Sequence, residues 1–147
     1  MNTKDKLILN VLKENSKLSV QKISKETNIP VTTVYNRIKN LEKNKIIKKY
    51  TILLDNKLLD KNIAAYVAIT MDYSLLKKMN LSQHDIAKKL KRNENVEEIA
   101  MITGIIDILI KIRVKDIEEL DNFVTKYLRN IDGIKKTQTM VVLNEVE

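Results

Sequence analysis

Residues 20–43 read VQKISKETNIPVTTVYNRIKNLEK, and this stretch decides how the first third of the chain folds. In its second half, Val34, Ile38 and Leu41 recur at helical spacing and form one apolar stripe. The spacing predicts a helix from about Thr32 to Lys43. The opposite face of that helix carries hydroxyls, amides and cations but no acid.

A shorter helical pattern, Val20 to Thr27, precedes this helix, and Ser19 is suited to be its N-cap. Asn28, Ile29 and Pro30 interrupt the two patterns. Two short helices with a tight break between them, the second basic and rich in amides, are typical of a helix-turn-helix. An ordinary helical hairpin with a solvated polar face would show much the same pattern.

On the helix-turn-helix interpretation, the exposed face of the second helix contacts double-stranded DNA. Asn36 lies at the centre of that face and is expected to reach a base edge, whereas Arg37 lies nearer the core and is expected to bind a phosphate. The candidate DNA-binding residues are Thr32, Thr33, Tyr35, Asn36, Arg37, Lys39, Asn40, Lys43 and Lys48.

The net charge of +8 is concentrated in the first part of the 147-residue chain. Residues 1–61 carry fourteen Lys/Arg and six Asp/Glu, whereas residues 62–147 carry thirteen of each. A basic part joined to a neutral part is typical of a nucleic-acid-binding module joined to another domain. A basic helix lying on a membrane is disfavoured, because the basic faces lack an apolar partner face rich in Trp, Phe or Leu.

A first helix over residues 4–14 completes the basic part, with Asp5 in its first turn. The three helices are expected to bury one small core, so we expect support from a neighbouring domain or subunit. The predicted core residues are Leu7, Ile8, Val11, Leu12, Leu18, Ile23, Ile29, Val34, Ile38 and Leu41.

Residues 46–54 (IIKKYTILL) are rich in β-branched side chains and predict one strand or a short ribbon, a wing beside the second helix. Asn44 is expected to end that helix in the left-handed conformation. Lys45, Lys48 and Lys49 would then lie near phosphates, or protect an edge strand from pairing. We expect a DNA-binding domain over residues 1–50, a strand and linker over 51–62, and a second domain over 63–147.

The second domain alternates strand and helix patterns in the order βαββαβ. Strands are expected at 63–71, 96–103, 106–114 and 134–143. Helices are expected after the capping patterns Ser82-x-x-Asp85 and Asp116-x-x-Glu119. Residues 74–81 are expected to be a loop or an extra turn. The order predicts an α+β fold, a split βαβ pair with helices on one face of an antiparallel sheet.

This arrangement leaves the other face of the sheet without a cover from the same chain. Apolar residues occupy both parities of the 106–114 strand, so that face is expected to be apolar as well. A second copy of the sheet is the expected cover, which predicts a homodimer.

Residues suited to catalysis or metal binding are scarce. The chain has no cysteine and one histidine, His84, which is expected to be solvated on the first turn of a helix. No nucleophile motif, nucleotide loop or metal-spaced cluster occurs, so we expect neither an enzyme nor a cofactor. The sequence has no long apolar run and no signal-peptide pattern, and the cytoplasm is the expected compartment.

Three segments together are similar to the Lrp/AsnC family of bacterial and archaeal feast/famine regulators. They are residues 28–50 (NIPVTTVYNRIKNLEKNKIIKKY), the pattern Val96-x6-Thr103-Gly104-x-x-Asp107, and the pattern Gly133-Ile134-x-x-Thr137-x-Thr139. The similarity extends from about Asp5 to the end of the chain. It implies a DNA-binding domain joined to an amino-acid-sensing domain, and dimers formed through the sheets that assemble into tetramers or octamers.

The resemblance also implies an effector site at the turn Thr103 to Asp107, for which we single out Thr103, Gly104, Ile105, Asp107 and Met140. Asp107 can bind an ammonium group or satisfy backbone groups of the turn. Ile105, Ile108 and Met140 would favour an apolar amino acid such as Leu, Ile, Val or Met.

The chain departs from the family pattern at several positions. Pro30 stands where the family usually has Ser, so the side-chain cap of the second helix is lost or passed to Thr32. Lys45 and Lys49 stand where Gly is frequent. Ile105, Ile106 and Ile108 stand where acidic and aromatic residues are common, with only Asp107 kept, and Met140 replaces a frequent aromatic.

Two other functions compete with an amino-acid-tuned regulator. One is a weakly specific DNA organiser that uses the same face without an effector. The other is a small-molecule-binding or enzymatic module joined to an RNA-binding half, which the missing catalytic cluster and the few sheet aromatics disfavour.

Overall fold

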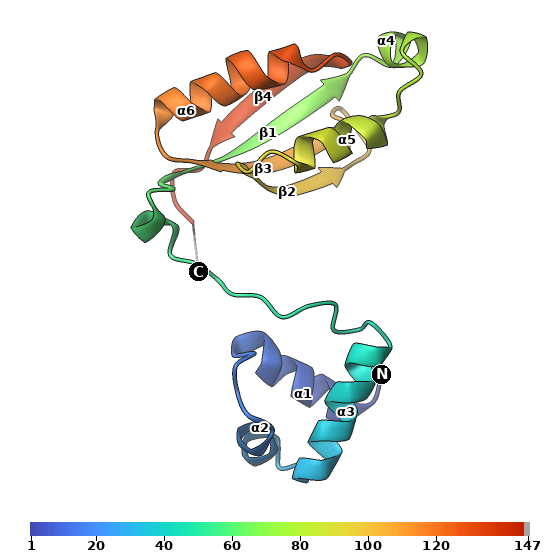
Figure 1. Cartoon of the computed structure of the whole chain (residues 1–147), viewed down its shortest axis with the longest axis vertical. Helices are drawn as coiled ribbons and strands as arrows, with labels where there is room; N and C mark the ends of the chain where they lie inside the picture. Colours follow the sequence, from blue (N-terminus) through green and yellow to red (C-terminus); the bar gives the residue numbers. More distant parts are fainter. Residues whose placement is uncertain (146–147) are drawn as a thin grey trace. The chain divides into compact units, whose positions relative to one another are not determined.

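The computed structural model describes residues 1–145, and these form two compact units that divide after Leu54 (Figure 1). Helix-turn-helix elements make up the first unit, and a βαββαβ sheet domain makes up the second. The α+β class predicted from the sequence is therefore confirmed. No helix in the described part of the chain is long and apolar enough to cross a membrane.

The first unit contains α1 (Thr3–Glu14), α2 (Val20–Thr27) and α3 (Val31–Lys43). As predicted, Ser19 caps α2, and its side chain accepts a hydrogen bond from the backbone N–H of Lys22. Pro30 is the N-cap of α3 and makes no side-chain capping bond, so the cap that serine would supply is lost and is not passed to Thr32.

One small cluster holds the three helices together. Ile8, Ile23 and Val34 are almost completely buried at its centre, one from each helix. Eight of the ten predicted core residues lie in this cluster or pack against it, and Leu41 is buried as well. Leu7 is the exception, because 44% of its surface is exposed.

The end of α3 differs from the prediction in two ways. Lys45, not Asn44, takes the left-handed conformation, with φ +55°. The N–H groups of Ile46 and Lys45 then bond to the carbonyls of Leu41 and Glu42, the pattern of a Schellman motif. The predicted wing is wrong: residues 44–62 contain no strand, only turns, irregular chain and the short 3-10 helix η1 (Asn56–Leu59).

The second unit is built on an antiparallel sheet with strand order β2-β3-β1-β4. Its strands are β1 (Ile63–Met71), β2 (Val96–Met101), β3 (Ile108–Val114) and β4 (Ile134–Val141). The helices between them are α4 (Tyr73–Lys78), α5 (Gln83–Lys91) and a run of α6 (Ile117–Asp121), the π-helical η2 (Asn122–Tyr127) and the 3-10 helix η3 (Leu128–Asn130).

Local capping signals start these helices where the sequence predicts. Ser82 and Asp85 form a reciprocal capping box on α5. The Asp116 side chain accepts from the N–H of Glu119 on α6, although the Glu119 carboxylate turns to the N–H of Lys115. The segment 74–81, expected as a loop or an extra turn, largely belongs to α4, capped by Asp72.

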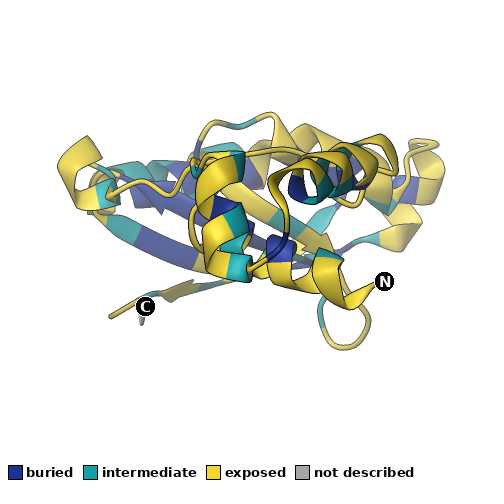
Figure 2. Cartoon of the chain, turned by 90° about the horizontal axis from the view of Figure 1, so that it is seen from below, coloured by how far each residue is buried: buried dark blue, intermediate teal, exposed yellow. Residues whose placement is uncertain are grey.

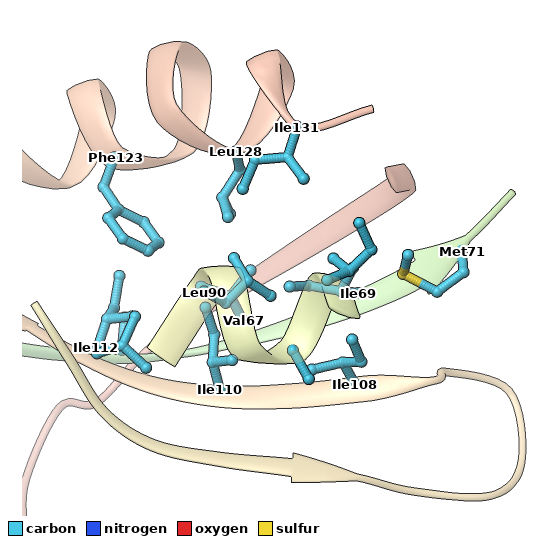
Figure 3. Packing of buried hydrophobic residues seen from close by; sticks show 14 of the residues in the cluster. Val67, Ile69, Met71, Leu90, Ile108, Ile110, Ile112, Phe123, Leu128 and Ile131 are labelled. Carbon is cyan, nitrogen blue, oxygen red and sulfur yellow. The ribbon is translucent and has the colours of Figure 1, made fainter. Parts of the chain in front are cut away.

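α5 and the α6 run cover one face of the sheet, and the largest core lies between them and the strands. Figure 3 shows Phe123 and Leu128 extending from the helical run toward Ile110 and Ile112 on β3. Ile108, Ile110 and Ile112 of β3 and Ala65, Val67, Ile69 and Met71 of β1 are buried in this core. Buried stretches of the strands are dark blue in Figure 2.

The opposite face of the sheet is not the apolar surface that we expected. Ile108, Ile110 and Ile112 all face the helices, so alternation turns Lys111 and Arg113 to the other side. Neighbouring strands add Tyr66, Ala68, Met140 and Gln138 to that side, according to their register. Polar and apolar groups are therefore mixed there.

Candidate nucleic-acid interface and effector turn

The solvent-facing side of α3 carries most of the predicted DNA-binding residues. The structure exposes Thr32, Tyr35, Asn36, Lys39, Asn40, Lys43 and, after the helix, Lys48, and leaves Thr33 and Arg37 half-buried. Within residues 1–145, the side chains of Thr32, Asn36 and Asn40 make no hydrogen bond to another residue of the chain. Their donors and acceptors are therefore ready for a partner.

Arg37 lies on the side of α3 that faces α1. Its Nη1 atom is 3.4 Å from Oδ1 of Asp5, whose side chain is only 14% exposed. The contact joins the second half of the helix-turn-helix to the first turn of α1. One nitrogen of the guanidinium is thus engaged, and the fork has further N–H donors for a phosphate.

A shallow groove of about 360 Å³ runs between α2 and the start of α3. Its lining residues are Val20, Gln21, Val31, Thr32, Tyr35 and Asn36. Lys39, one turn after Tyr35, places its Nζ 5.8 Å from the centre of the tyrosine ring and 3.8 Å from a Glu42 carboxylate oxygen. The cation helps to hold the ring at the edge of the groove.

A side-chain hydrogen bond also links α3 to the segment that follows it. The Tyr50 hydroxyl donates to Oε1 of Glu42 at 2.9 Å. Partial burial, together with this bond to a carboxylate, raises the pKa of Tyr50 above its ordinary value. Lys48 and Lys49 are exposed on the intervening segment, which follows α3 without forming a wing.

The candidate effector turn connects β2 to β3. Gly104 has φ +121°, a conformation that glycine adopts without strain, and a Cβ atom there would meet nothing within 4 Å. Ile105 is 96% exposed at the tip. Thr103, Gly104 and Ile105 therefore form an open surface, whereas Asp107 lies half-buried at its base.

Asp107 is bonded from several directions. One carboxylate oxygen accepts from the backbone N–H of Met71 at 2.7 Å, and the other accepts from the Tyr73 hydroxyl at 2.6 Å. The Gln83 side chain donates to the Asp107 carbonyl at 2.6 Å. The bond to Asp107, with a smaller contribution from burial, raises the pKa of Tyr73. Asp107 thus joins the end of β1, α4 and α5.

Two residues predicted to surround the turn lie elsewhere in this unit. Met140 is paired with Tyr66 on β1, three to five residues before the Ile69 and Met71 backbone groups that bond to Asp107. That separation is about 10–17 Å along the strand. Ile108 is completely buried in the core and offers no surface to a ligand.

Sequence reasoning missed Tyr73 and Gln83, which contact Asp107 directly. Both line an open groove of about 530 Å³ over α4 and the start of α5, together with Leu76, Lys77, Asn80, Leu81, Ser82 and Asp85. Asp72 is of a residue type preferred at helix N-caps, and this signal would have indicated where α4 begins, next to Tyr73.

A charged cluster on the sheet face away from the helices was also missed. Glu145 Oε1 lies 2.7 Å from Arg113 Nη2 and 3.0 Å from Lys111 Nζ, and Glu97 bonds to Arg113 as well. These hydrogen bonds and charges lower the pKa of Glu145 to about 2. The alternation of Lys111 and Arg113 with isoleucines on β3 would have placed both cations on one face.

No group of side chains among residues 1–145 is arranged to hold a metal ion. His84, the one histidine of the sequence, is exposed on the first turn of α5, as predicted.

Family models match both units of the chain. A model described as winged helix-turn-helix DNA-binding matches residues 1–48, and the Lrp/AsnC ligand binding domain matches residues 64–147. An uncharacterized HTH-type transcriptional regulator of Pyrococcus furiosus is 36% identical over 137 residues, 93% of this chain and 89% of that protein. The HTH-type regulator FL11 of the same organism is 34% identical over 139 residues, 95% of this chain and 87% of that protein.

Solved structures share the whole fold at lower identity. A transcriptional regulator of Neisseria meningitidis, solved as a complex with L-Met, has a TM-score of 0.90 at 23% identity and covers 100% of this chain and 92% of its own. The AsnC protein of E. coli has a TM-score of 0.83 at 23% identity, with 99% and 93% covered. The two matching family models and the similarity to regulators over more than nine-tenths of the sequence establish that the chain belongs to the Lrp/AsnC family of DNA-binding transcriptional regulators, which are not enzymes.

Proposed function

We propose that this protein is a cytoplasmic, sequence-specific regulator that reads double-stranded DNA with the exposed face of α3. The observation that carries the proposal is the set of unbonded hydroxyls and amides on that face, flanked by cations, in the part of the chain that holds all the excess positive charge. A selection of bound duplexes from a random pool tests it, with a conserved consensus as the expected result. Failure to bind any duplex at low salt would refute it.

Asn36 and Arg37 have separate roles in this proposal. Asn36 is exposed at the centre of the α3 face and reads a base edge, so Asn36→Ala weakens operator binding by about 1–3 kcal/mol and relaxes specificity at one position. Arg37 binds a phosphate through the donors that Asp5 leaves open, so Arg37→Ala weakens binding to all sequences alike. Titrations of operator and scrambled duplexes compare the two variants. Equal loss on both duplexes for Asn36→Ala would contradict its base-reading role.

Salt dependence gives an independent measure of the interface. Each phosphate that is neutralised contributes a slope of about −0.9 to the log–log plot of affinity against salt. Lys48→Ala removes an exposed cation and should make the slope less steep by about one, without changing the consensus. An unchanged slope would exclude Lys48 from the interface.

The second unit forms a homodimer through the sheet face that bears Tyr66, Lys111, Arg113 and Met140. Tyr66 and Met140 are 38% and 44% exposed there, and a two-fold axis would set these apolar groups against their copies. Two copies of α3 then favour a pseudo-palindromic operator, with half-sites about one helical turn or a multiple of it apart. Light scattering at micromolar concentration tests the dimer and reports any tetramer or octamer. The mass of a single chain would contradict it.

The turn Thr103 to Asp107 binds a small apolar amino acid as effector. Support comes from the open, positive-φ Gly104, the exposed Ile105, the ligand-binding-domain match and the L-Met bound to a relative of the same fold. The ammonium group would join Met71 N–H and the Tyr73 hydroxyl as a further partner of Asp107. Effector and DNA binding are then reciprocally coupled, by about 1–3 kcal/mol.

Calorimetric titration with each of the twenty amino acids, with and without operator DNA, tests the effector. Binding heat from Leu, Ile, Val or Met that changes when operator is present supports the effector hypothesis. The matched variant is Tyr73→Phe, which removes one hydrogen bond to Asp107 and keeps its carboxylate. An effector-independent DNA organiser is the second candidate, favoured by the occupation of both Asp107 carboxylate oxygens within the chain. No heat from any amino acid, together with weak sequence preference, would select that candidate.

A further inference from the structure

The groove between α2 and α3 differs from its surroundings, because it is apolar in the middle of a basic, polar surface. Val31 and Tyr35 line it while remaining 42% and 52% exposed. Neither packs in the first core, which is closed by Val34 and other residues of the three helices. The folding of this unit therefore does not account for two large apolar side chains at the start of the recognition helix.

The polar residues around the groove come from both helices. Gln21 from α2 and Asn36 from α3 carry primary amides, and both are exposed. A primary amide can donate to N7 and accept from the N6 amino group of adenine at once, which makes Asn and Gln the usual partners of that base. The groove therefore combines apolar side chains with amide groups that can hydrogen-bond to adenine.

In the major groove an A·T pair presents both of these features side by side. Adenine offers N7 and N6, and thymine offers its O4 acceptor and the apolar C5-methyl group. No other base pair of ordinary DNA carries a methyl group there. The side chains lining this groove match that combination of one apolar and one amide-binding element.

We propose that this groove holds the C5-methyl group of a thymine and makes one A·T pair of each half-site a determinant of specificity. The proposal rests on the proposed function, since it needs duplex DNA on the α3 face. Val31 and Tyr35 contact the methyl group, and Asn36 or Gln21 binds the adenine of the same or the adjacent pair. The positive charge of residues 1–61 favours a polyanion as the occupant over a free apolar ligand.

Lys39 acts as a positioning residue for this contact. Its Nζ lies 5.8 Å from the centre of the Tyr35 ring, so the cation restricts the ring at the edge of the groove. Lys39→Gln should therefore reduce methyl discrimination in addition to the general loss of affinity that any lost cation causes.

The test uses the full chain and its selected operator, in which each thymine is replaced in turn by deoxyuridine. That replacement removes one methyl group and changes nothing else on the base. At one position in each half-site the affinity should fall about four-fold, the factor that burial of one methyl-sized group contributes. At every other thymine the change should be negligible.

Variants of the groove identify which side chains cause the effect. Val31→Thr keeps the shape but places a hydroxyl in the groove, and Tyr35→Ala removes the ring. In both, thymine and deoxyuridine operators should bind almost equally. The matched control is Lys48→Ala, which should weaken both operators alike and preserve their ratio. Because Val31 and Tyr35 are exposed, thermal unfolding should be unchanged and will verify that the variants fold.

The outcomes separate the inference from the function on which it depends. Operator binding with no position sensitive to deoxyuridine, or with a sensitivity that Val31→Thr and Tyr35→Ala leave intact, overturns the thymine groove alone. A selected consensus without an A·T pair in its half-sites does the same. Failure of the wild-type chain to bind any duplex overturns the proposed function and the groove together.

Discussion

The two units use their polar side chains in opposite ways. On α3, Thr32, Asn36 and Asn40 have no partner within residues 1–145. At the β2–β3 turn, Asp107 is bonded by β1 and α4 through its carboxylate and by α5 through its carbonyl. A surface with unbonded groups can bind at once, whereas a ligand at Asp107 must add to existing bonds or replace them. The α3 face therefore offers its polar groups to a partner directly, whereas those of Asp107 already stabilise the fold of the second unit.

The largest effect should come from disrupting the core between the sheet and the helices of the second unit. Ile110→Asp places a charge at a completely buried position under the helices, and we expect the second unit to lose about 4 kcal/mol or more of stability. Tyr66→Asp is the matched control on the other sheet face, where the side chain is 38% exposed. It should weaken the dimer and leave the fold of each chain intact.

Circular dichroism and light scattering on both variants separate these outcomes. A folded Ile110→Asp chain, or an unfolded Tyr66→Asp chain, would reverse the assignment of the two sheet faces.

A smaller effect should follow from weakening the Asp107 network itself. Asp107→Asn keeps a single acceptor oxygen for the Met71 N–H and the Tyr73 hydroxyl, so we expect a loss of about 1–3 kcal/mol in urea unfolding. Tyr73→Phe removes only the hydroxyl bond and should cost about 0.5–1.5 kcal/mol. If neither variant is destabilised, the Asp107 bonds do not stabilise the second unit. The proposed contrast with the unbonded polar groups on α3 would then be wrong.

In the first unit, Lys45 lets the stability of the fold be compared with the affinity for DNA. A lysine at φ +55° is disfavoured by about 1–2 kcal/mol relative to glycine, which adopts this conformation without hindrance. Part of that gain is offset because glycine gives the unfolded chain more freedom. Lys45→Gly should therefore raise stability by up to about 1 kcal/mol and lower DNA affinity through the lost charge. A melting curve measures the change in stability, and a binding titration measures the change in DNA affinity. A lower melting temperature for Lys45→Gly would contradict the expected gain in stability.

The smallest effect concerns the Glu145 ion pairs with Arg113 and Lys111. The pKa of Glu145 is lowered from 4.5 to about 2, so its stabilising contribution is complete above about pH 4.5 and is lost as the pH falls toward 2. The Glu145 side chain is 46% exposed, so screening keeps the contribution below about 1 kcal/mol. Glu145→Gln should remove this part of the acid dependence and show less effect at high salt. If wild type and Glu145→Gln show the same dependence of unfolding free energy on pH, the Glu145 ion pairs do not contribute to stability.

Features that depend on local sequence could be predicted well. The helices α1, α2 and α3 begin within a residue of their expected positions, because apolar periodicity and capping by Ser19 act over a few neighbouring residues. The capping box of Ser82 and Asp85 located α5 for the same reason. The exposed face of α3, and with it most of the DNA-binding candidates, followed from the periodicity alone.

Features that depend on distant partners could not be predicted in this way. Residues 46–54 have the composition of a strand but no strand to pair with, so β propensity alone did not produce a wing. The family resemblance assigns Met140 to the turn, whereas its position depends on the register of β4 against Tyr66. The contact of Asp107 with Tyr73 joins residues 34 positions apart, and no local pattern indicates such a contact.

Gly133 lies directly before β4 and is in close contact with α4, the helix whose Tyr73 bonds to Asp107. A Cβ atom at Gly133 would lie 2.5 Å from Cδ2 of the buried Leu76 on α4, and the Gly133 carbonyl accepts from the N–H of Asp72, the cap of that helix. Because α4 begins with Tyr73, which bonds to Asp107, a side chain at position 133 would press on the helix that carries one of the Asp107 partners. Gly133 therefore allows α4 to lie against the start of β4 while Tyr73 on the same helix bonds to Asp107.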